Sequence, residues 1–160
     1  MNIEFELNGE PVSADVDPQE PLRDVLRREF GETGVKSGCL SGRCGVCTIH
    51  LDGESAKSCL LLAGKADGKS VTTIEGVSED AETELTDLQA ALDEHFGLQC
   101  GYCTPGFVMA AEEYLADDPD PDREKIKGAI KGNLCRCTGY VKIVDAIESV
   151  AVDRAESNSD

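Results

Sequence analysis

Apolar and polar residues alternate in the first two segments of the chain, as they do in half-buried β-strands. The alternation covers residues 2–7 (NIEFEL) and residues 12–16 (VSADV). Asn8-Gly9 lies between them, and this dipeptide favours the tight turn of a β-hairpin. The pattern therefore predicts that the chain opens with a β-hairpin.

A short amphipathic helix is expected next, over residues 21–30, where four apolar residues recur at helical spacing: Leu22, Val25, Leu26 and Phe30. A glycine-rich loop follows, and then three β-rich segments are expected, at residues 47–51, 59–62 and 70–75. The order strand, strand, helix, loop, strand, strand, strand is that of a β-grasp domain.

In the second half of the chain every periodic segment is helical. Four apolar stripes predict four short helices: Leu85, Leu88, Leu92 and Phe96; Phe107, Ala110, Ala111, Tyr114 and Leu115; Ile126, Ala129 and Ile130; Val141, Val144, Ile147 and Val150. The expected fold class is therefore α+β, with a β-grasp domain at residues 1–76, an acidic linker at 77–84 and a small four-helix bundle at 85–152. Residues 153–160 have nothing to bury and are expected to form a disordered tail.

Two domains of this size have small cores, and cysteines offer a staple for both. The chain has eight cysteines, four in each predicted domain. The first group is spaced C-x4-C-x2-C-x11-C, and its first three members match plant-type [2Fe-2S] ferredoxins, which makes the first domain ferredoxin-like. Glycines 38, 42 and 45 would let backbone N–H groups turn towards such a cluster. Zinc competes poorly for this spacing. The predicted ligands of a first [2Fe-2S] cluster are Cys39, Cys44, Cys47 and Cys59.

The second group combines a C-x2-C pair with a later C-x-C pair, and each pair directly precedes an expected helix. Thr104 and Thr138 are expected as N-caps, with Pro105 at the first helical position. Two positive helix ends would then face one negatively charged site. Zinc stays open here as an alternative. The predicted ligands of a second [2Fe-2S] cluster are Cys100, Cys103, Cys135 and Cys137.

Charge narrows the possible partners. The 32 acidic and 15 basic residues give a formal net charge of −17, which argues against nucleic acid and anionic membranes. An ordinary solvated surface would explain the acidity, but adaptation to high salt, in which cations screen the carboxylates, is the preferred interpretation. The sequence shows neither a signal peptide nor a membrane span, so a cytoplasmic protein with reduced thiols is expected.

Five segments resemble the small iron-sulfur subunit of the molybdenum hydroxylases, a family that includes xanthine dehydrogenase, aldehyde oxidoreductases and aerobic carbon monoxide dehydrogenase. They are GVKSGCLSGRCGVCTIHLDG, KSCLLLAG, TTIEGV, LQCGYCTPGFVMAAEEYL and GNLCRCTGYVKIVDAI. The likeness covers about residues 2–150. HFGLQCGYCTPG and the run from residue 58 to residue 76 are most similar to the carbon monoxide dehydrogenase small subunit.

The resemblance implies an electron-transfer subunit that has no catalytic residue of its own. In this family a large subunit holds molybdopterin and oxidises substrate, and a medium subunit holds FAD. The cysteines of the helical domain would accept each electron first, and Gln99 would contact the pterin. His50 and His95 are expected to be surface or core residues rather than ligands.

Two other functions fit parts of the sequence. A free-standing two-cluster ferredoxin shuttle would need only the first half, so it leaves the second half unexplained. A zinc-stabilised interaction module would have no redox role, and it would be colourless.

The acidic composition predicts that salt stabilises the protein. The Debye length falls from about 30 Å at 0.01 M to about 3 Å at 1 M ionic strength, so repulsion among the carboxylates is screened. The melting temperature and the retention of cluster colour are expected to rise together from dilute to molar potassium chloride. A melting temperature that is flat or falls with salt would instead favour the ordinary solvated surface.

Overall fold

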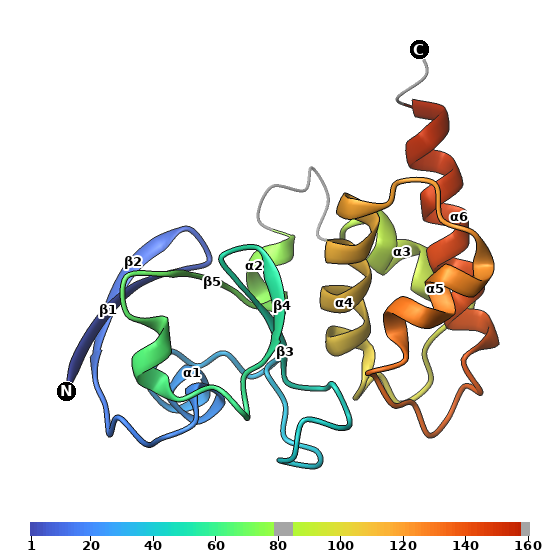
Figure 1. The fold of residues 1–160 in the computed structure, drawn as a ribbon. Helices are drawn as coiled ribbons and strands as arrows, with labels where there is room; N and C mark the ends of the chain where they lie inside the picture. Colours follow the sequence, from blue (N-terminus) through green and yellow to red (C-terminus); the bar gives the residue numbers. More distant parts are fainter. Residues whose placement is uncertain (79–84, 158–160) are drawn as a thin grey trace.

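The computed structural model describes residues 1–78 and 85–157, which form a sheet-containing half and a helical half (Figure 1). The expected linker at 77–84 lies mostly outside the described residues, since 79–84 are not among them. Within the described ranges no helix is long and apolar enough to cross a membrane.

The first half contains a five-stranded sheet in the order β2-β1-β5-β3-β4. Its strands are β1 (Asn2–Leu7), β2 (Glu10–Asp15), β3 (Thr48–Leu51), β4 (Glu54–Lys57) and β5 (Ser70–Thr72). Helix α1 (Leu22–Glu29), the 3-10 helix η1 (Ala63–Ala66) and the short helix α2 (Ile74–Val77) complete this half. Strands β1 and β5 are parallel and the other pairs are antiparallel.

The predicted opening hairpin is confirmed. Ile3, Phe5 and Leu7 are buried while the residues between them are exposed, as the alternation required. Asn8 and Gly9 have φ values of 51° and 84°, the left-handed conformations that a two-residue hairpin turn needs. The buried face of β1 shares its core with the buried residues of α1.

Two strand predictions need correction. Residues 59–62 do not form a strand, because the tight turn at Asp52-Gly53 brings Glu54 directly opposite Leu51 and so begins β4 five residues earlier than expected. Beyond β4 the chain leaves the sheet and makes one isolated bridge, between Leu62 and Pro21. The expected strand at 70–75 ends at Thr72, and α2 begins at Ile74.

The second half confirms four helices: α3 (Asp87–Glu94), α4 (Thr104–Asp117), α5 (Arg123–Ile130) and α6 (Val141–Ser157). Their buried apolar residues form one core, separate from the core of the sheet. A capping box begins α3, since Thr86 and Gln89 each bond the backbone N–H of the other.

The ends of the helical stripes differ from the prediction. Phe96 is 79% exposed, because α3 ends at Glu94 and the N–H of Gly97 turns back to the carbonyl of Leu92 at 2.7 Å. Leu85 and Val141 are also exposed. They lie at or before helix ends, where the neighbouring helices no longer cover them.

The expected tail at 153–160 is wrong for its first five residues. Helix α6 continues to Ser157. Arg154 binds Asp87 of α3 at 2.6 and 2.7 Å and also binds Glu112 of α4 at 2.9 Å. These ion pairs attach the last turns of α6 to two other helices, an effect that apolar periodicity does not report. Residues 158–160 lie outside the described part of the chain.

Helix α4 lies against β3 and β4 and joins the two halves (Figure 1). His50 Nε2 lies 2.7 Å from the carbonyl of Met109, and the N–H of Ser55 donates to Glu113 Oε1 at 2.8 Å. His50 thus makes a contact between the two halves, and its exclusion as a metal ligand stays a prediction. Gly106 in α4 meets the backbone carbonyl of Gly45 so closely that a Cβ would overlap it.

Gly106→Ala is therefore expected to separate the two halves locally and to lower the free energy of unfolding by about 1–3 kcal/mol. The matched control is Gly128→Ala in α5, where nothing lies within 4 Å of the added Cβ. Alanine should stabilise that helix by about 1 kcal/mol. Urea unfolding of the full chain measures both changes, and equal effects of the two variants would contradict the close contact.

Candidate metal centres

The first four cysteines lie on two segments at one end of the sheet. Cys39, Cys44 and Cys47 lie on the loop between α1 and β3, and Cys59 follows β4. Backbone N–H groups of Ser41, Arg43 and Cys44 donate to Cys39 Sγ at 3.4, 3.2 and 3.3 Å. Hydrogen bonding, chiefly from the Ser41 N–H, lowers the pKa of Cys39 to about 6 and favours its thiolate, the form that binds metal.

Glycine makes this loop possible at specific points. Gly42 and Gly45 have φ values of 74° and 76°, which L side chains rarely adopt. Gly38 is required for space instead, since a Cβ there would lie 2.7 Å from Cys44 Sγ. Leu40 also has a positive φ, of 57°, which is unfavourable for a residue with a side chain and is imposed by the turn around Cys39. The predicted role of the glycines in bringing backbone N–H groups near sulfur agrees with this geometry.

Cys47 lies in a drier environment than the other cysteines of its group, since it is buried and they are half-buried. Burial, the largest effect, raises the pKa of Cys47 to about 11. Ser58 directly precedes Cys59 and holds the backbone there against Cys47, because its N–H and Oγ both donate to the Cys47 carbonyl, at 3.2 and 2.7 Å. A bound cation would be needed to hold the Cys47 thiolate at neutral pH, as a metal ion does.

The other four cysteines come from two segments at one end of the helical bundle. Cys100 Sγ and Cys137 Sγ lie 3.8 Å apart. The N–H and Oγ1 of Thr138 donate to Cys135 Sγ at 3.4 and 3.1 Å. Burial raises the pKa of Cys103 to about 12. The structure thus brings the sequence-distant pairs together, and their role as ligands of one cluster stays a prediction.

The helix starts near this centre differ from the prediction in detail. Cys103 itself holds the N-cap position of α4, without a capping side chain, and Thr104 is the first helical residue. Thr138 accepts a hydrogen bond from the N–H of Tyr140 at 3.2 Å, and α6 begins at Val141. Thr138 therefore serves both the cysteine and the turn before the helix.

The donor set fits iron-sulfur clusters better than single ions. A tetrahedral zinc ion needs four ligands around one point, whereas a [2Fe-2S] core distributes four thiolates over two irons. Four thiols with backbone N–H donors aimed at sulfur suit the second arrangement.

The two cysteine loops are hydrogen-bonded to each other. The N–H of Leu134 donates to the Cys44 carbonyl at 2.9 Å, and Asn133 Nδ2 donates to the Gly45 carbonyl at 3.2 Å. Asn133 is buried. Sequence reasoning missed Asn133, although a polar residue within the short GNLC segment before two cysteines was the available signal.

Gln99 and Arg136 lie beside the second group of cysteines, and both are exposed. Gln99 Nε2 donates to the carbonyl of Cys137 at 3.3 Å. Tyr102 reaches the other loop, since its OH donates to the Ser37 carbonyl at 2.6 Å. Gln99 thus contacts the second cysteine loop, and its side chain is exposed at the surface, where a partner could reach it.

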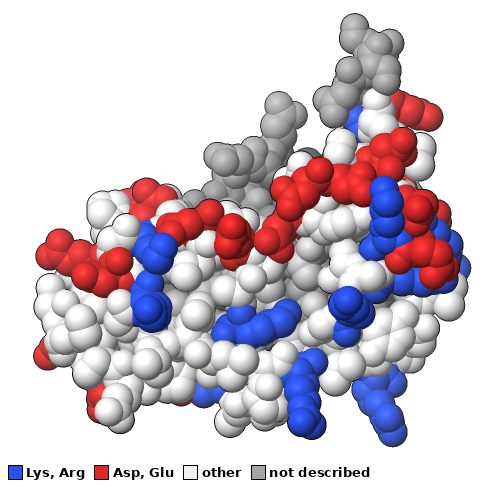
Figure 2. Space-filling view, in the orientation of Figure 1, with Lys and Arg blue, Asp and Glu red and all other residues white. Residues whose placement is uncertain are grey.

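Charge is segregated around these loops. Residues 33–51, 98–111 and 125–144, which hold seven of the eight cysteines, contain no aspartate or glutamate. On the face shown in Figure 2, acidic side chains gather along the upper rim, and basic ones are scattered across the face, some of them at the lower edge, the end at which the cysteine loops lie in Figure 1. The net negative charge is therefore kept away from the cysteines.

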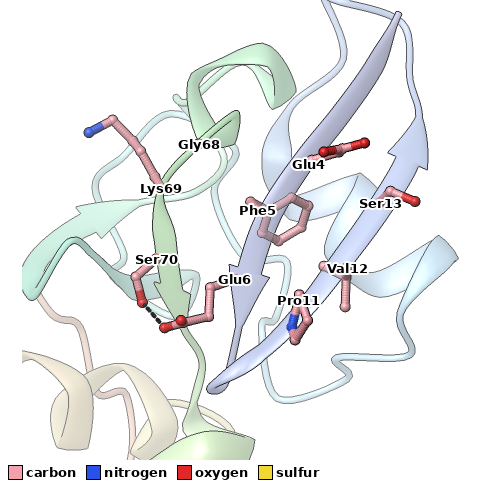
Figure 3. A pocket seen from close by; sticks show the side chains of 9 residues that line it. All are labelled: Glu4, Phe5, Glu6, Pro11, Val12, Ser13, Gly68, Lys69 and Ser70. Atoms are coloured by element: carbon pink, nitrogen blue, oxygen red, sulfur yellow. Dashed lines mark hydrogen bonds between the residues drawn. The ribbon is translucent and has the colours of Figure 1, made fainter.

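A separate hollow lies on the sheet between β1, β2 and β5 (Figure 3). Ser70 Oγ donates there to Glu6 Oε1 at 2.8 Å, and the lining includes neither cysteine nor histidine. Nothing in its lining suggests chemistry related to the cysteines.

Comparison with known proteins agrees with the two-part architecture. A family described as "2Fe-2S iron-sulfur cluster binding domain" matches residues 5–73, and one described as "[2Fe-2S] binding domain" matches residues 73–148. The chain is 46% identical to the nicotinate dehydrogenase small FeS subunit of Eubacterium barkeri, over 96% of each chain. It is 41% identical to the xanthine dehydrogenase iron-sulfur-binding subunit of Escherichia coli O157:H7, over 92% of each.

Solved structures give the same result. A chain of quinoline 2-oxidoreductase from Pseudomonas putida 86 superposes with a TM-score of 0.91 at 44% identity, over 99% of this chain and 96% of that one. The aldehyde oxidoreductase of Desulfovibrio gigas gives 0.90 at 39% identity, over 98% of this chain and only 17% of the longer chain.

Fold and matches define an α+β protein with two successive [2Fe-2S] domains. The chain belongs to the family of small iron-sulfur subunits of the molybdenum hydroxylases, as the sequence resemblance implied. The relatives described above are named for other substrates, so the finer likeness to the carbon monoxide dehydrogenase small subunit stays a prediction.

Proposed function

We propose that this chain relays single electrons from a molybdopterin centre towards FAD, each held by a partner subunit. Family membership supports the role. The observation that carries it is the pair of four-cysteine groups, whose loops hydrogen-bond directly to each other through Leu134 and Cys44. A free-standing shuttle would leave that connection between two centres without a use.

The eight predicted cysteines would hold two [2Fe-2S] clusters, four cysteines to each. When bound, each cluster supplies a site that gains and loses one electron. The chain's own residues set the environment: backbone N–H groups donate to Cys39, and Thr138 donates to Cys135. These donors stabilise negative charge on sulfur and so favour the reduced state.

The direction of transfer follows from the family resemblance. The helical-domain cysteines, Cys100, Cys103, Cys135 and Cys137, would receive each electron first and the ferredoxin-like domain would pass it on. Gln99 is the proposed contact to the pterin, because it is exposed and its amide is bonded to the backbone of Cys137. The large molybdopterin subunit, the medium FAD subunit and a cytoplasmic location remain parts of this proposal.

Metal analysis of the natively isolated chain is expected to give about four irons and four acid-labile sulfides. Cys44→Ser should remove one reduced-state EPR signal and Cys135→Ser the other. A chain with about two irons, or with stoichiometric zinc and no colour, would rule out the two-cluster proposal. Loss of both signals from either folded variant would show that the cysteines have been assigned to the wrong sites.

Gln99→Ala is expected to leave both clusters assembled and to slow the arrival of electrons at the helical domain in the complete enzyme. Its amide bridges the proposed pterin and the Cys137 backbone, and the variant removes that bridge. Stopped-flow reduction by substrate measures the rate, with Gln19→Ala, an exposed residue before α1, as a control. A rate equal to that of the unmodified enzyme would remove Gln99 from the pathway.

A further inference from the structure

A lysine is fixed beside the first group of cysteines. Lys57 is the last residue of β4 and lies opposite Thr48 of β3, which directly follows Cys47. Its Nζ donates to Thr48 Oγ1 at 2.7 Å. The Thr48 hydroxyl in turn donates to the Gly45 carbonyl at 2.6 Å. This chain of hydrogen bonds ties the ammonium group to the backbone between Cys44 and Cys47.

The helical half closes over the same place. Asn133 Nδ2 donates to the Gly45 carbonyl at 3.2 Å, so that one oxygen accepts from both halves of the protein. Gly132 of the helical half lies next to the ammonium group, since a Cβ built there would be in ordinary contact with Lys57 Nζ, at 3.9 Å. Lys57 is half-buried and Thr48 is buried. The ammonium group therefore lies where water screens it less than on the open surface.

The charges around Lys57 are mostly those of the cysteines. Burial is the largest effect on its pKa and lowers it, while the thiolates of Cys47, Cys44 and Cys59 act in the opposite direction. Glu113 acts with the thiolates and offsets part of the lysine's charge. The acceptor of the lysine's hydrogen bond is a neutral hydroxyl, so the positive charge is not cancelled by a carboxylate in contact.

We propose that Lys57 sets the reduction potential of the cluster held by Cys39, Cys44, Cys47 and Cys59, raising it through a fixed positive charge. Reduction adds one electron to the cluster, and a nearby cation stabilises the added negative charge more than it stabilises the oxidised form. A higher potential in the ferredoxin-like domain makes transfer from the helical domain more favourable. The inference rests on the proposed function, since it requires a cluster at this site.

The test is an EPR-monitored redox titration of the full chain with both clusters assembled, in which dithionite supplies the electrons. Lys57→Met removes the charge, and Lys57→Gln removes it while keeping an N–H donor for Thr48. Both variants should lower the reduced-to-oxidised ratio of the first cluster about tenfold at a fixed potential, which is 59 mV for a one-electron couple. Lys57→Arg should stay within about twofold of the unmodified chain.

Two controls separate position from net charge. Lys65→Met makes the same change in total charge on an exposed residue of η1 and should leave the first cluster's potential unchanged. The second cluster, titrated in the same samples, should keep its potential in every variant. If Lys57→Met loses its cluster, Lys57→Gln and Thr48→Val still test the inference, the latter because it releases the ammonium from its anchor and should lower the potential partially.

A potential unchanged in both neutral variants, or an equal shift in Lys65→Met, would overturn the role of Lys57. That result would leave the proposed function intact, because both EPR signals would still be present. Absence of two cluster signals from the unmodified chain would instead overturn the proposed function itself.

Discussion

The carbonyl of Gly45 is the point on which the arrangement of the two centres depends. It accepts one hydrogen bond from Thr48 in its own domain and one from Asn133 in the other. Gly106 packs against the same carbonyl so closely that no side chain fits between them. Because Gly45 lies between two cysteines of the first loop, these contacts fix that loop against the segment leading into Cys135. Each domain is too small to hold an irregular loop rigid alone, and the contact lets each support the other.

The charged residues are also distributed unevenly with respect to the cysteines. All aspartates and glutamates lie outside residues 33–51, 98–111 and 125–144, and the first and last of these segments also carry lysine or arginine. Clusters ligated by four thiolates are themselves negative, and nearby carboxylates would disfavour their reduction. The segregation keeps the repulsion small where electrons are to be received, while the remaining surface carries the negative charge. The half-buried ammonium group of Lys57 is proposed to act in the same direction, by favouring reduction of the first cluster.

The cysteines differ in ways that suit a holo-protein rather than a set of reactive thiols. Hydrogen bonds lower the pKa of Cys39, and burial raises that of Cys47 and Cys103. Cys47 is buried while the other three thiols of its group are half-buried, and Cys100 and Cys137 are exposed while Cys103 and Cys135 are half-buried. Each group therefore presents some of its thiols more openly to the surface than others. Such an arrangement suits electron entry and exit along defined directions.

Sequence by itself determined those features that depend on near neighbours in the chain. The opening hairpin follows from alternation and the Asn8-Gly9 turn, the four helices follow from their apolar stripes, and the two cysteine groups follow from spacing. Only the tertiary structure decided the position of β4, the extension of α6 through Arg154, and the contacts of Asn133 and Lys57. Asn133 and Gly45 are 88 residues apart, and Arg154 and Asp87 are 67 apart. Such contacts depend on how two separately formed cores pack against each other, and local periodicity carries no record of that packing.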